Sequence, residues 1–127
     1  AGARNVIISC GAHGSLLLDE NGVEHIVPTA HVRLVNATGA GDSMVAGFLA
    51  QVTQGVDYET ALIFASACGT ATAASKGIAH RERIDRVVSA LYKKMGRAIP
   101  GTIARDIEAN KARVAAEDSG ESSEGDK

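Results

Sequence analysis

The sequence of 127 residues predicts an α/β fold, and three features carry that prediction. Short apolar runs rich in β-branched residues fall in the first 35 residues, which is typical of strands. From residue 43 to about residue 95, apolar residues recur at helical spacing. A glycine-rich turn at residues 38–41 joins the two parts, so strands are expected to lead into helices at this point.

Four strands are predicted in the first part of the chain. Val6–Ser9 is a β-branched run, which predicts a buried parallel strand. The turn Asp19–Gly22 has Asn-Gly at its tip and predicts a β-hairpin between residues 15–18 and the alternating segment Val23–Val27. The segment His31–Val35 predicts a further strand that leads into the glycine-rich turn.

Three helices are predicted after that turn. The first runs from Ser43 to Gln54, and the third runs from about Arg83 to Met95. Between them, a long helix is expected from Tyr58 to about Ser75, with Asp57 as its N-cap. Gly69 in the middle of that helix costs up to about 1 kcal/mol relative to alanine, which implies close approach to a neighbouring backbone or to a flat ligand.

The end of the chain predicts little packed structure. Residues 1–100 are expected to hold the domain, since Pro100-Gly101 interrupts the helical pattern. Residues 101–116 have a thin apolar face and predict a weak helical extension. Residues 117–127 contain no apolar side chain, so a disordered acidic tail is expected there.

Composition argues against several classes of protein. No apolar run reaches the roughly 20 residues of a membrane span, and no basic stripe with interleaved aromatics indicates nucleic-acid binding. Cys10 and Cys68 lie in unlike contexts and indicate neither a disulfide framework nor a metal site, which predicts a reducing, cytoplasmic compartment. The first five residues lead directly into a strand without signal-peptide features, so we expect a piece of a longer chain.

The glycine-rich turn predicts an anion-binding site. A helix N-terminus leaves backbone N–H groups unpaired and carries a partial positive charge. Glycines allow the backbone to approach a ligand closely and to adopt positive φ without strain. Phosphate is the usual anion bound at such a terminus.

Asp42 in this segment has two interpretations. In the first, Asp42 or Ser43 caps the helix and the glycines only form the turn. In the second, the Asp42 carboxylate is a general base beside a phosphate site and takes the proton of a substrate hydroxyl. Phosphoryl transfer needs this combination of amides and carboxylate.

The segment Asn36-Ala-Thr-Gly-Ala-Gly-Asp42, followed by Ser-Met-Val-Ala-Gly47, resembles a signature of the PfkB/ribokinase family of carbohydrate kinases. That signature is usually Asp-Thr-x-Gly-Ala-Gly-Asp, so Asn36 and Ala37 depart from it. The departure and the continuation after Asp42 resemble the 1-phosphofructokinase and tagatose-6-phosphate kinase branch. The resemblance implies an anion hole and a catalytic base at Gly39, Ala40, Gly41 and Asp42.

A second motif, Ser9-Cys-Gly-Ala-His-Gly14, follows the first predicted strand. By itself such a motif is usually only a turn. In the family, a Thr/Ser-x-Gly-x-x-Gly loop at this place contacts the phosphates and ribose of the nucleotide. The resemblance therefore implies nucleotide binding by Ser9, Gly11, Gly14, Gly41, Asp42 and Ser75. Two explanations of the small-residue segment 65–74 remain open. One is close packing in the core, and the other is a part in the adenine pocket.

The resemblance implies a ribokinase-like α/β fold, of which this chain supplies the C-terminal part of a mainly parallel sheet with a β-hairpin, flanked by helices. It implies ATP-dependent phosphoryl transfer to a phosphorylated ketohexose, with Mg²⁺ bridging the phosphate oxygens. Fructose 1-phosphate is the first expected substrate, followed by fructose 6-phosphate and tagatose 6-phosphate. No metal site built by the protein itself is expected.

The resemblance also implies a partner, the N-terminal half of the same enzyme, which holds most of the family's sugar contacts. The chain alone is therefore expected to be an incomplete, inactive fragment, and a homodimer is compatible with the resemblance. Two alternatives stay open. One is a non-catalytic nucleotide-binding fragment or module, and the other is a ribokinase-like kinase for a free sugar or a nucleoside.

Overall fold

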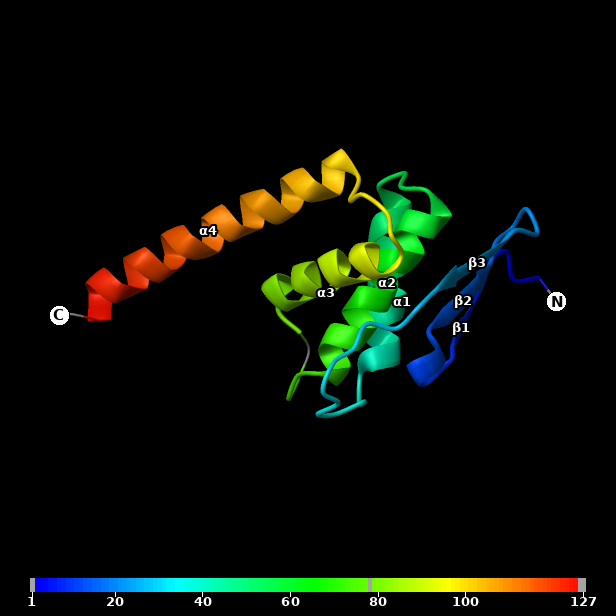
Figure 1. Cartoon of the computed structure of the whole chain (residues 1–127), viewed down its shortest axis with the longest axis horizontal. Helices are drawn as coiled ribbons and strands as arrows, with labels where there is room; N and C mark the ends of the chain where they lie inside the picture. Colours follow the sequence, from blue (N-terminus) through cyan, green and yellow to red (C-terminus); the bar gives the residue numbers. More distant parts are fainter. Residues whose placement is uncertain (1, 78, 126–127) are drawn as a thin grey trace. The chain divides into compact units, whose positions relative to one another are not determined.

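The computed structural model describes residues 2–77 and 79–125 and has an α/β architecture (Figure 1). Three strands are followed by helices, and a short 3-10 helix, η1, lies between the first two strands. The strands are β1 (Val6–Ser9), β2 (Ser15–Leu18) and β3 (Glu24–Val27), and η1 is Gly11–His13. The helices are α1 (Ala40–Thr53), α2 (Tyr58–Ala73), α3 (Arg81–Lys94) and α4 (Gly101–Gly125).

The chain forms two compact units, Ala1–Arg97 and Ala98–Lys127. The second unit consists mainly of α4, which continues to Gly125 instead of ending near Ala116. The segment from residue 117 to residue 125 is thus helical where the sequence predicts disorder, and residues 126 and 127 lie outside the described part of the chain. In the described parts of both units, no helix is long and apolar enough to cross a membrane.

The sheet has the order β1-β2-β3, and both pairs of neighbouring strands are antiparallel. The prediction that Val6–Ser9 is a parallel strand is therefore wrong for this sheet, because β1 pairs with β2 in the antiparallel direction. The reason is the short connection from β1 to β2, whose only regular structure is η1. A parallel pair needs a crossover of a dozen or more residues, whereas a short loop can only reverse the chain.

The prediction of a strand at His31–Val35 is also wrong. In the structure this segment has no strand partner among the described residues, and the N–H groups of Val35 and Asn36 both donate to the carbonyl oxygen of Ala73, at 2.8 and 3.0 Å. The end of α2 thus takes the hydrogen bonds that a neighbouring strand would supply. The apolar pattern alone could not distinguish these two partners.

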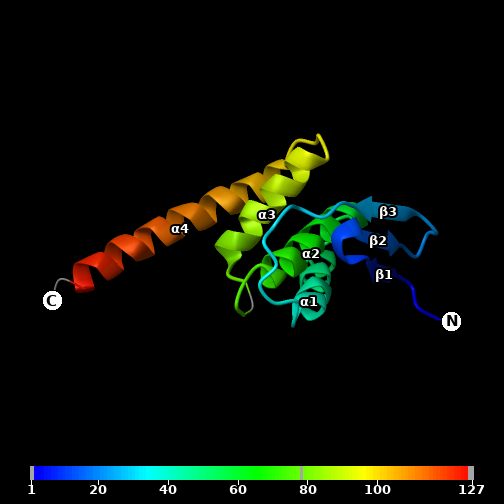
Figure 2. The same cartoon turned by 60° about the horizontal axis from the view of Figure 1, so that its bottom comes forward.

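One face of the sheet is buried and the other is open. Leu17 and Val27 are fully buried on the face that packs against α2, and Figure 2 shows the sheet and the helices as adjoining layers. On the opposite face, Ile8, Leu18 and Ile26 are 49%, 42% and 67% exposed. Because side chains alternate along a strand, the sheet exposes an apolar face that no described element of this unit covers.

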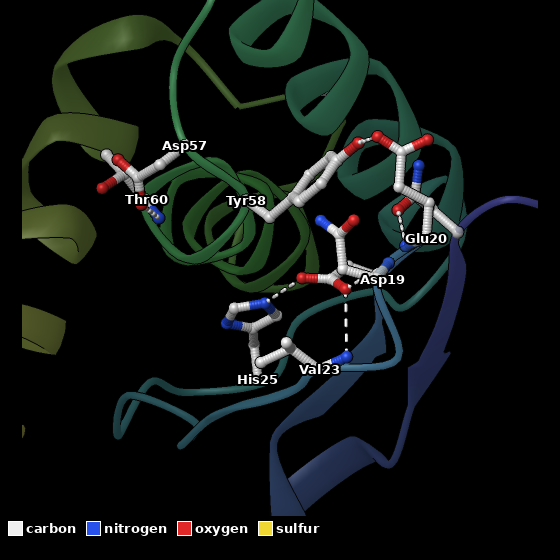
Figure 3. Close-up of polar contacts among 9 residues, drawn as sticks. Asp19, Glu20, Val23, His25, Asp57, Tyr58 and Thr60 are labelled. Carbon is white, nitrogen blue, oxygen red and sulfur yellow. Dashed lines mark hydrogen bonds and ion pairs between the residues drawn. The ribbon is translucent and has the colours of Figure 1, made fainter.

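The hairpin between β2 and β3 forms as predicted and is stabilised by Asp19 (Figure 3). One Asp19 carboxylate oxygen accepts the N–H groups of Asn21 and Val23, at 2.8 and 3.0 Å. The other lies 2.7 Å from His25 Nε2. The hydrogen bond with His25 and those with the turn N–H groups lower the pKa of Asp19 against the opposing effect of burial.

The lowered pKa of Asp19 predicts a loss of stability in acid. A carboxyl group with a depressed folded-state pKa stabilises the protein above its unfolded pKa, and this contribution disappears as pH falls through the folded value. We therefore expect the difference in Tm between the wild type and Asp19→Asn to be largest near neutral pH and to shrink below about pH 4. Thermal unfolding measured from pH 7 to pH 3 checks this. A constant difference in Tm across that range would contradict it.

Helix α2 is central to the first unit and contacts α1, α3, β2 and β3. It starts as predicted, with the Asp57 carboxylate accepting the N–H of Thr60 at 3.1 Å. The predicted close approach at Gly69 is also confirmed, because a Cβ there would lie 3.1 Å from the carbonyl oxygen of Ala40 in α1. At a second close contact, a Cβ on Gly47 would lie 2.8 Å from Cys68 Sγ. Glycines therefore let the backbones of α1 and α2 lie close together.

Candidate functional site

A cavity of about 630 Å³ lies in the first unit, where the loop after β1, the segment after β3 and the helices α1 and α2 meet. A volume of this size is typical of small-molecule sites. Two glycine-containing segments far apart in the sequence reach it, namely 9–14 and 39–42. Among the residues that line it are Ser9, Gly11, Gly14, Thr29, Leu34, Ala40, Gly41, Met44, Ser66, Gly69, Thr70, Ala73 and Lys94.

Helix α1 begins at Ala40, earlier than the predicted Ser43. Its N-cap is Gly39, which has a φ of +83° and therefore needs glycine. No side chain caps this terminus, so the capping interpretation of Asp42 is not what the structure shows. Gly41 lies within the helix and does not require a positive φ.

Hydrogen bonds around Asn36 shape the turn before α1. The side-chain oxygen of Asn36 accepts the N–H of Thr38 at 2.9 Å, and the N–H of Ala40 donates to the carbonyl of Ala37 at 3.2 Å. The N–H groups of Gly41 and Asp42 have no acceptor within the described part of the chain. Two donors at the positive end of a helix are thus free to bind an anion.

Asp42 lies in the first turn of α1 and is exposed, next to these free N–H groups. Ala40 and Gly41 line the cavity, whereas Gly39 and Asp42 do not. The neighbouring Ser43 is held by a 3.0 Å hydrogen bond that its hydroxyl accepts from Thr72 in α2. Asp42 therefore directly follows two residues of the cavity wall, on a helix turn that contacts with α2 hold in place.

The loop from Ser9 to Gly14 closes on itself. The N–H of Cys10 donates to the carbonyl oxygen of Gly14 at 2.8 Å, and the Thr29 hydroxyl donates to the carbonyl of Gly11, also at 2.8 Å. Gly11 and Gly14 have φ values of +57° and +96°. At Gly14, a Cβ would in addition lie only 2.2 Å from the carbonyl oxygen of Val27. Ser9, Gly11 and Gly14 all line the cavity, so the structure brings the two predicted loops together.

Ser75 is a further predicted site residue that does not line this cavity. Its hydroxyl donates to the carbonyl oxygen of Ala71 at 2.8 Å, which satisfies it within the end of α2. The small-residue segment 65–74 is divided between the core and the cavity wall. Ala67 and Ala71 are buried in the core, while Gly69 and Ala73 line the cavity.

One further lining residue, Lys94, was not indicated by the sequence. Lys94, at the end of α3, donates through Nζ to the carbonyl oxygen of Thr29 at 2.6 Å. This bond ties α3 to the segment after β3 at the edge of the cavity. A lysine in the last turn of a helix is ordinarily explained by the helix dipole, so only the fold could reveal its second role.

Among the residues described, no group of three or more His, Cys, Asp or Glu side chains is placed to hold an ion. The phosphate oxygens of a bound nucleotide are a usual source of ligands for Mg²⁺.

Known proteins resemble this chain over its first unit. A family model described as "pfkB family carbohydrate kinase" matches residues 1–83. The 1-phosphofructokinase of Bacillus subtilis is 36% identical over 87 residues, which cover 68% of this chain and 28% of that protein. The D-tagatose-1-phosphate kinase of Bacillus licheniformis is 38% identical over 88 residues, covering 69% of this chain and 29% of that protein.

Solved structures also resemble this chain. Ribokinase from Thermotoga maritima matches with a TM-score of 0.62 and 30% identity, over 69% of this chain and 31% of that one. Arabidopsis thaliana ribokinase, complexed with ribose and ATP, matches with a TM-score of 0.62 and 25% identity, over 68% of this chain and 30% of that one. The chain thus spans less than a third of the length of these relatives.

Proposed function

Because the chain belongs to the pfkB family of carbohydrate kinases, we propose that it is part of an ATP-dependent kinase that phosphorylates a ketohexose phosphate. Fructose 1-phosphate is the first choice of substrate, since relatives named 1-phosphofructokinase match the sequence of this chain. A relative named D-tagatose-1-phosphate kinase supports the wider class of ketohexose phosphates. Fructose 6-phosphate and tagatose 6-phosphate are the next choices.

The observation that carries the proposal is the pair of free N–H groups at Gly41, which lines the cavity, and at the next residue, Asp42, whose side chain is exposed. Free amides at a helix N-terminus suit the γ-phosphate of ATP, whose negative charge they stabilise during transfer. The loop Ser9–Gly14 lies on the same cavity and suits the remaining phosphates and the ribose. One cavity can therefore hold the nucleotide with its reactive end at α1.

Asp42 then acts as the general base. Its carboxylate takes the proton of the attacking sugar hydroxyl while the hydroxyl oxygen forms a bond to the γ-phosphorus, and ADP leaves with the electron pair of the broken P–O bond. Mg²⁺, carried by the phosphate oxygens, supplies further charge neutralisation when it is bound. We place this reaction in the cytoplasm, and we assign the sugar site to parts of the enzyme outside this chain.

The proposal is tested by measuring ADP release from the full-length protein with MgATP and one ketohexose phosphate at a time. The four sugars are fructose 1-phosphate, fructose 6-phosphate, tagatose 6-phosphate and tagatose 1-phosphate, the last from the name of a relative. We expect sugar-dependent ADP release at about 1–10³ per second, fastest with fructose 1-phosphate. The chain of 127 residues, assayed in parallel, should release no ADP in response to sugar, because a missing second site removes about 7–11 kcal/mol of positioning.

Two results would contradict this proposal. Binding of ATP by the full-length protein without turnover of any sugar would favour the non-catalytic nucleotide-binding module. Sugar-dependent turnover by the chain of 127 residues would mean that it contains its own sugar site, against the assignment of that site to the rest of the enzyme.

A further inference from the structure

The short helix η1, at the tip of the loop Ser9–Gly14, is not held in place by packing. None of its residues is buried, and a Cβ at Gly11 would meet no other atom within 4 Å. Its backbone hydrogen bonds, such as that from the N–H of Gly14 to the carbonyl oxygen of Gly11, stay within the loop. Among the residues described, the bond from the Thr29 hydroxyl to the carbonyl oxygen of Gly11 is the hydrogen bond that joins η1 to another segment. The position of η1 therefore depends on where Thr29 lies.

Thr29 is itself held by Lys94. It belongs to the segment after β3, which forms no strand in the described part of the chain. Its carbonyl oxygen accepts a hydrogen bond of 2.6 Å from Lys94 Nζ. A charged donor makes a stronger hydrogen bond than a neutral one. Thr29 thus bonds η1 through its side chain and α3 through its backbone, and the second of these bonds is charge-assisted.

Helix α3, which ends at Lys94, is a firm base for this connection. Val88 and Leu91 on α3 are almost fully buried, and the helix contacts α2. Lys94, Thr29 and Gly11 all line the cavity, so the connection runs along its wall. Lys94 also lies beyond residues 1–83, the part of the chain that the family model matches.

We propose that Lys94 is a positioning residue for the nucleotide, because through Thr29 it holds the loop Ser9–Gly14 in the conformation that binds the phosphates and ribose. The inference rests on the proposed nucleotide-dependent function. A simpler explanation of Lys94 is its favourable interaction with the helix dipole. That explanation applies equally to Lys93, which lies in the same last turn but does not line the cavity. The two lysines therefore separate positioning from a general effect of charge.

The first measurement is hydrogen exchange in the full-length protein without ligand. In Lys94→Met, the amides of Cys10 and Gly14 should exchange at least about threefold faster than in the wild type, because the loop opens more often. Thr29→Val removes the hydroxyl but keeps the branched shape, and it should have the same effect. Thr29→Ser keeps the hydroxyl and should exchange like the wild type. The matched control, Lys93→Met, should also exchange like the wild type.

The second measurement is nucleotide binding and turnover by the same proteins. The Kd for MgATP should rise about threefold to tenfold in Lys94→Met and in Thr29→Val, a change of the size that one hydrogen bond produces. The kcat with fructose 1-phosphate should stay within about twofold of the wild-type value, because neither change touches Asp42. The double variant should bind MgATP about as well as the weaker single variant, since either change breaks the same connection.

Several results would overturn the inference while the proposed function stands. Equal effects in Lys93→Met would reduce the role of Lys94 to its charge. Weaker binding of MgATP by Lys94→Met with unchanged exchange would mean that Lys94 contacts the ligand directly and does not position the loop. An unchanged Kd for MgATP, with or without faster exchange, would show that the connection does not serve nucleotide binding. A wild-type protein that does not bind MgATP overturns both the inference and the proposed function.

Discussion

Replacing Asp42 by asparagine in the full-length enzyme should lower kcat by about 10²–10⁴, the usual contribution of a general base. The asparagine side chain has nearly the same shape, so the first turn of α1 and its free N–H groups should persist. ATP binding should therefore change little, because the anion site is made of backbone donors. The measurement is steady-state kinetics with fructose 1-phosphate, together with the Kd for MgATP.

A matched control for this variant is Asp106→Asn, an exposed carboxylate on α4, in the other compact unit. It should leave kcat within about twofold of the wild-type value, since it removes one surface charge from a residue that does not line the described cavity. Near-normal turnover by a correctly folded Asp42→Asn protein would show that this carboxylate is not the base.

Gly14→Ala should produce the largest loss of stability expected from a single substitution in the loop Ser9–Gly14. Gly14 has a φ of +96° and a ψ of −150°, a conformation that only glycine adopts readily. Its new Cβ would lie 2.2 Å from the carbonyl oxygen of Val27. The backbone strain and the clash together should lower the free energy of unfolding by about 2–6 kcal/mol, which urea denaturation measures.

Gly11→Ala separates these two causes. Gly11 also has a positive φ, of +57°, but a Cβ there meets no other atom within 4 Å. This variant should lose only the cost of the left-handed conformation, about 1–2 kcal/mol. Equal losses for the two variants would mean that the contact between Gly14 and Val27 contributes nothing to stability.

Predictions from local sequence succeeded where one residue type has one physical explanation. Asp57 as N-cap of α2, the turn at Asp19–Gly22 and the close approach at Gly69 were predicted from side-chain chemistry or size, and the structure confirms them. The parallel strand at Val6–Ser9 and the strand at His31–Val35 were wrong, because strand direction and pairing depend on partners distant in the sequence.

The candidate site also combines features that the local sequence predicts with features that it does not. Glycine motifs predicted the loop Ser9–Gly14 and the turn before α1, and the structure places both at one cavity. Lys94 could not be predicted, since a lysine in the last turn of a helix is ordinarily explained by the helix dipole. Its position on the cavity wall comes from the packing of α3, which no local pattern contains.

The contact between Gly69 and Ala40 has a consequence for the conformational entropy of the anion site. A long side chain that held α1 in place would have to give up rotamer freedom, at a cost of up to about 2 kcal/mol. Glycine has no side-chain rotamers to lose, so at this contact α2 meets the first turn of α1 through its backbone. The free N–H groups of Gly41 and Asp42 are therefore ordered before any anion arrives, and little of the binding free energy is needed to arrange them.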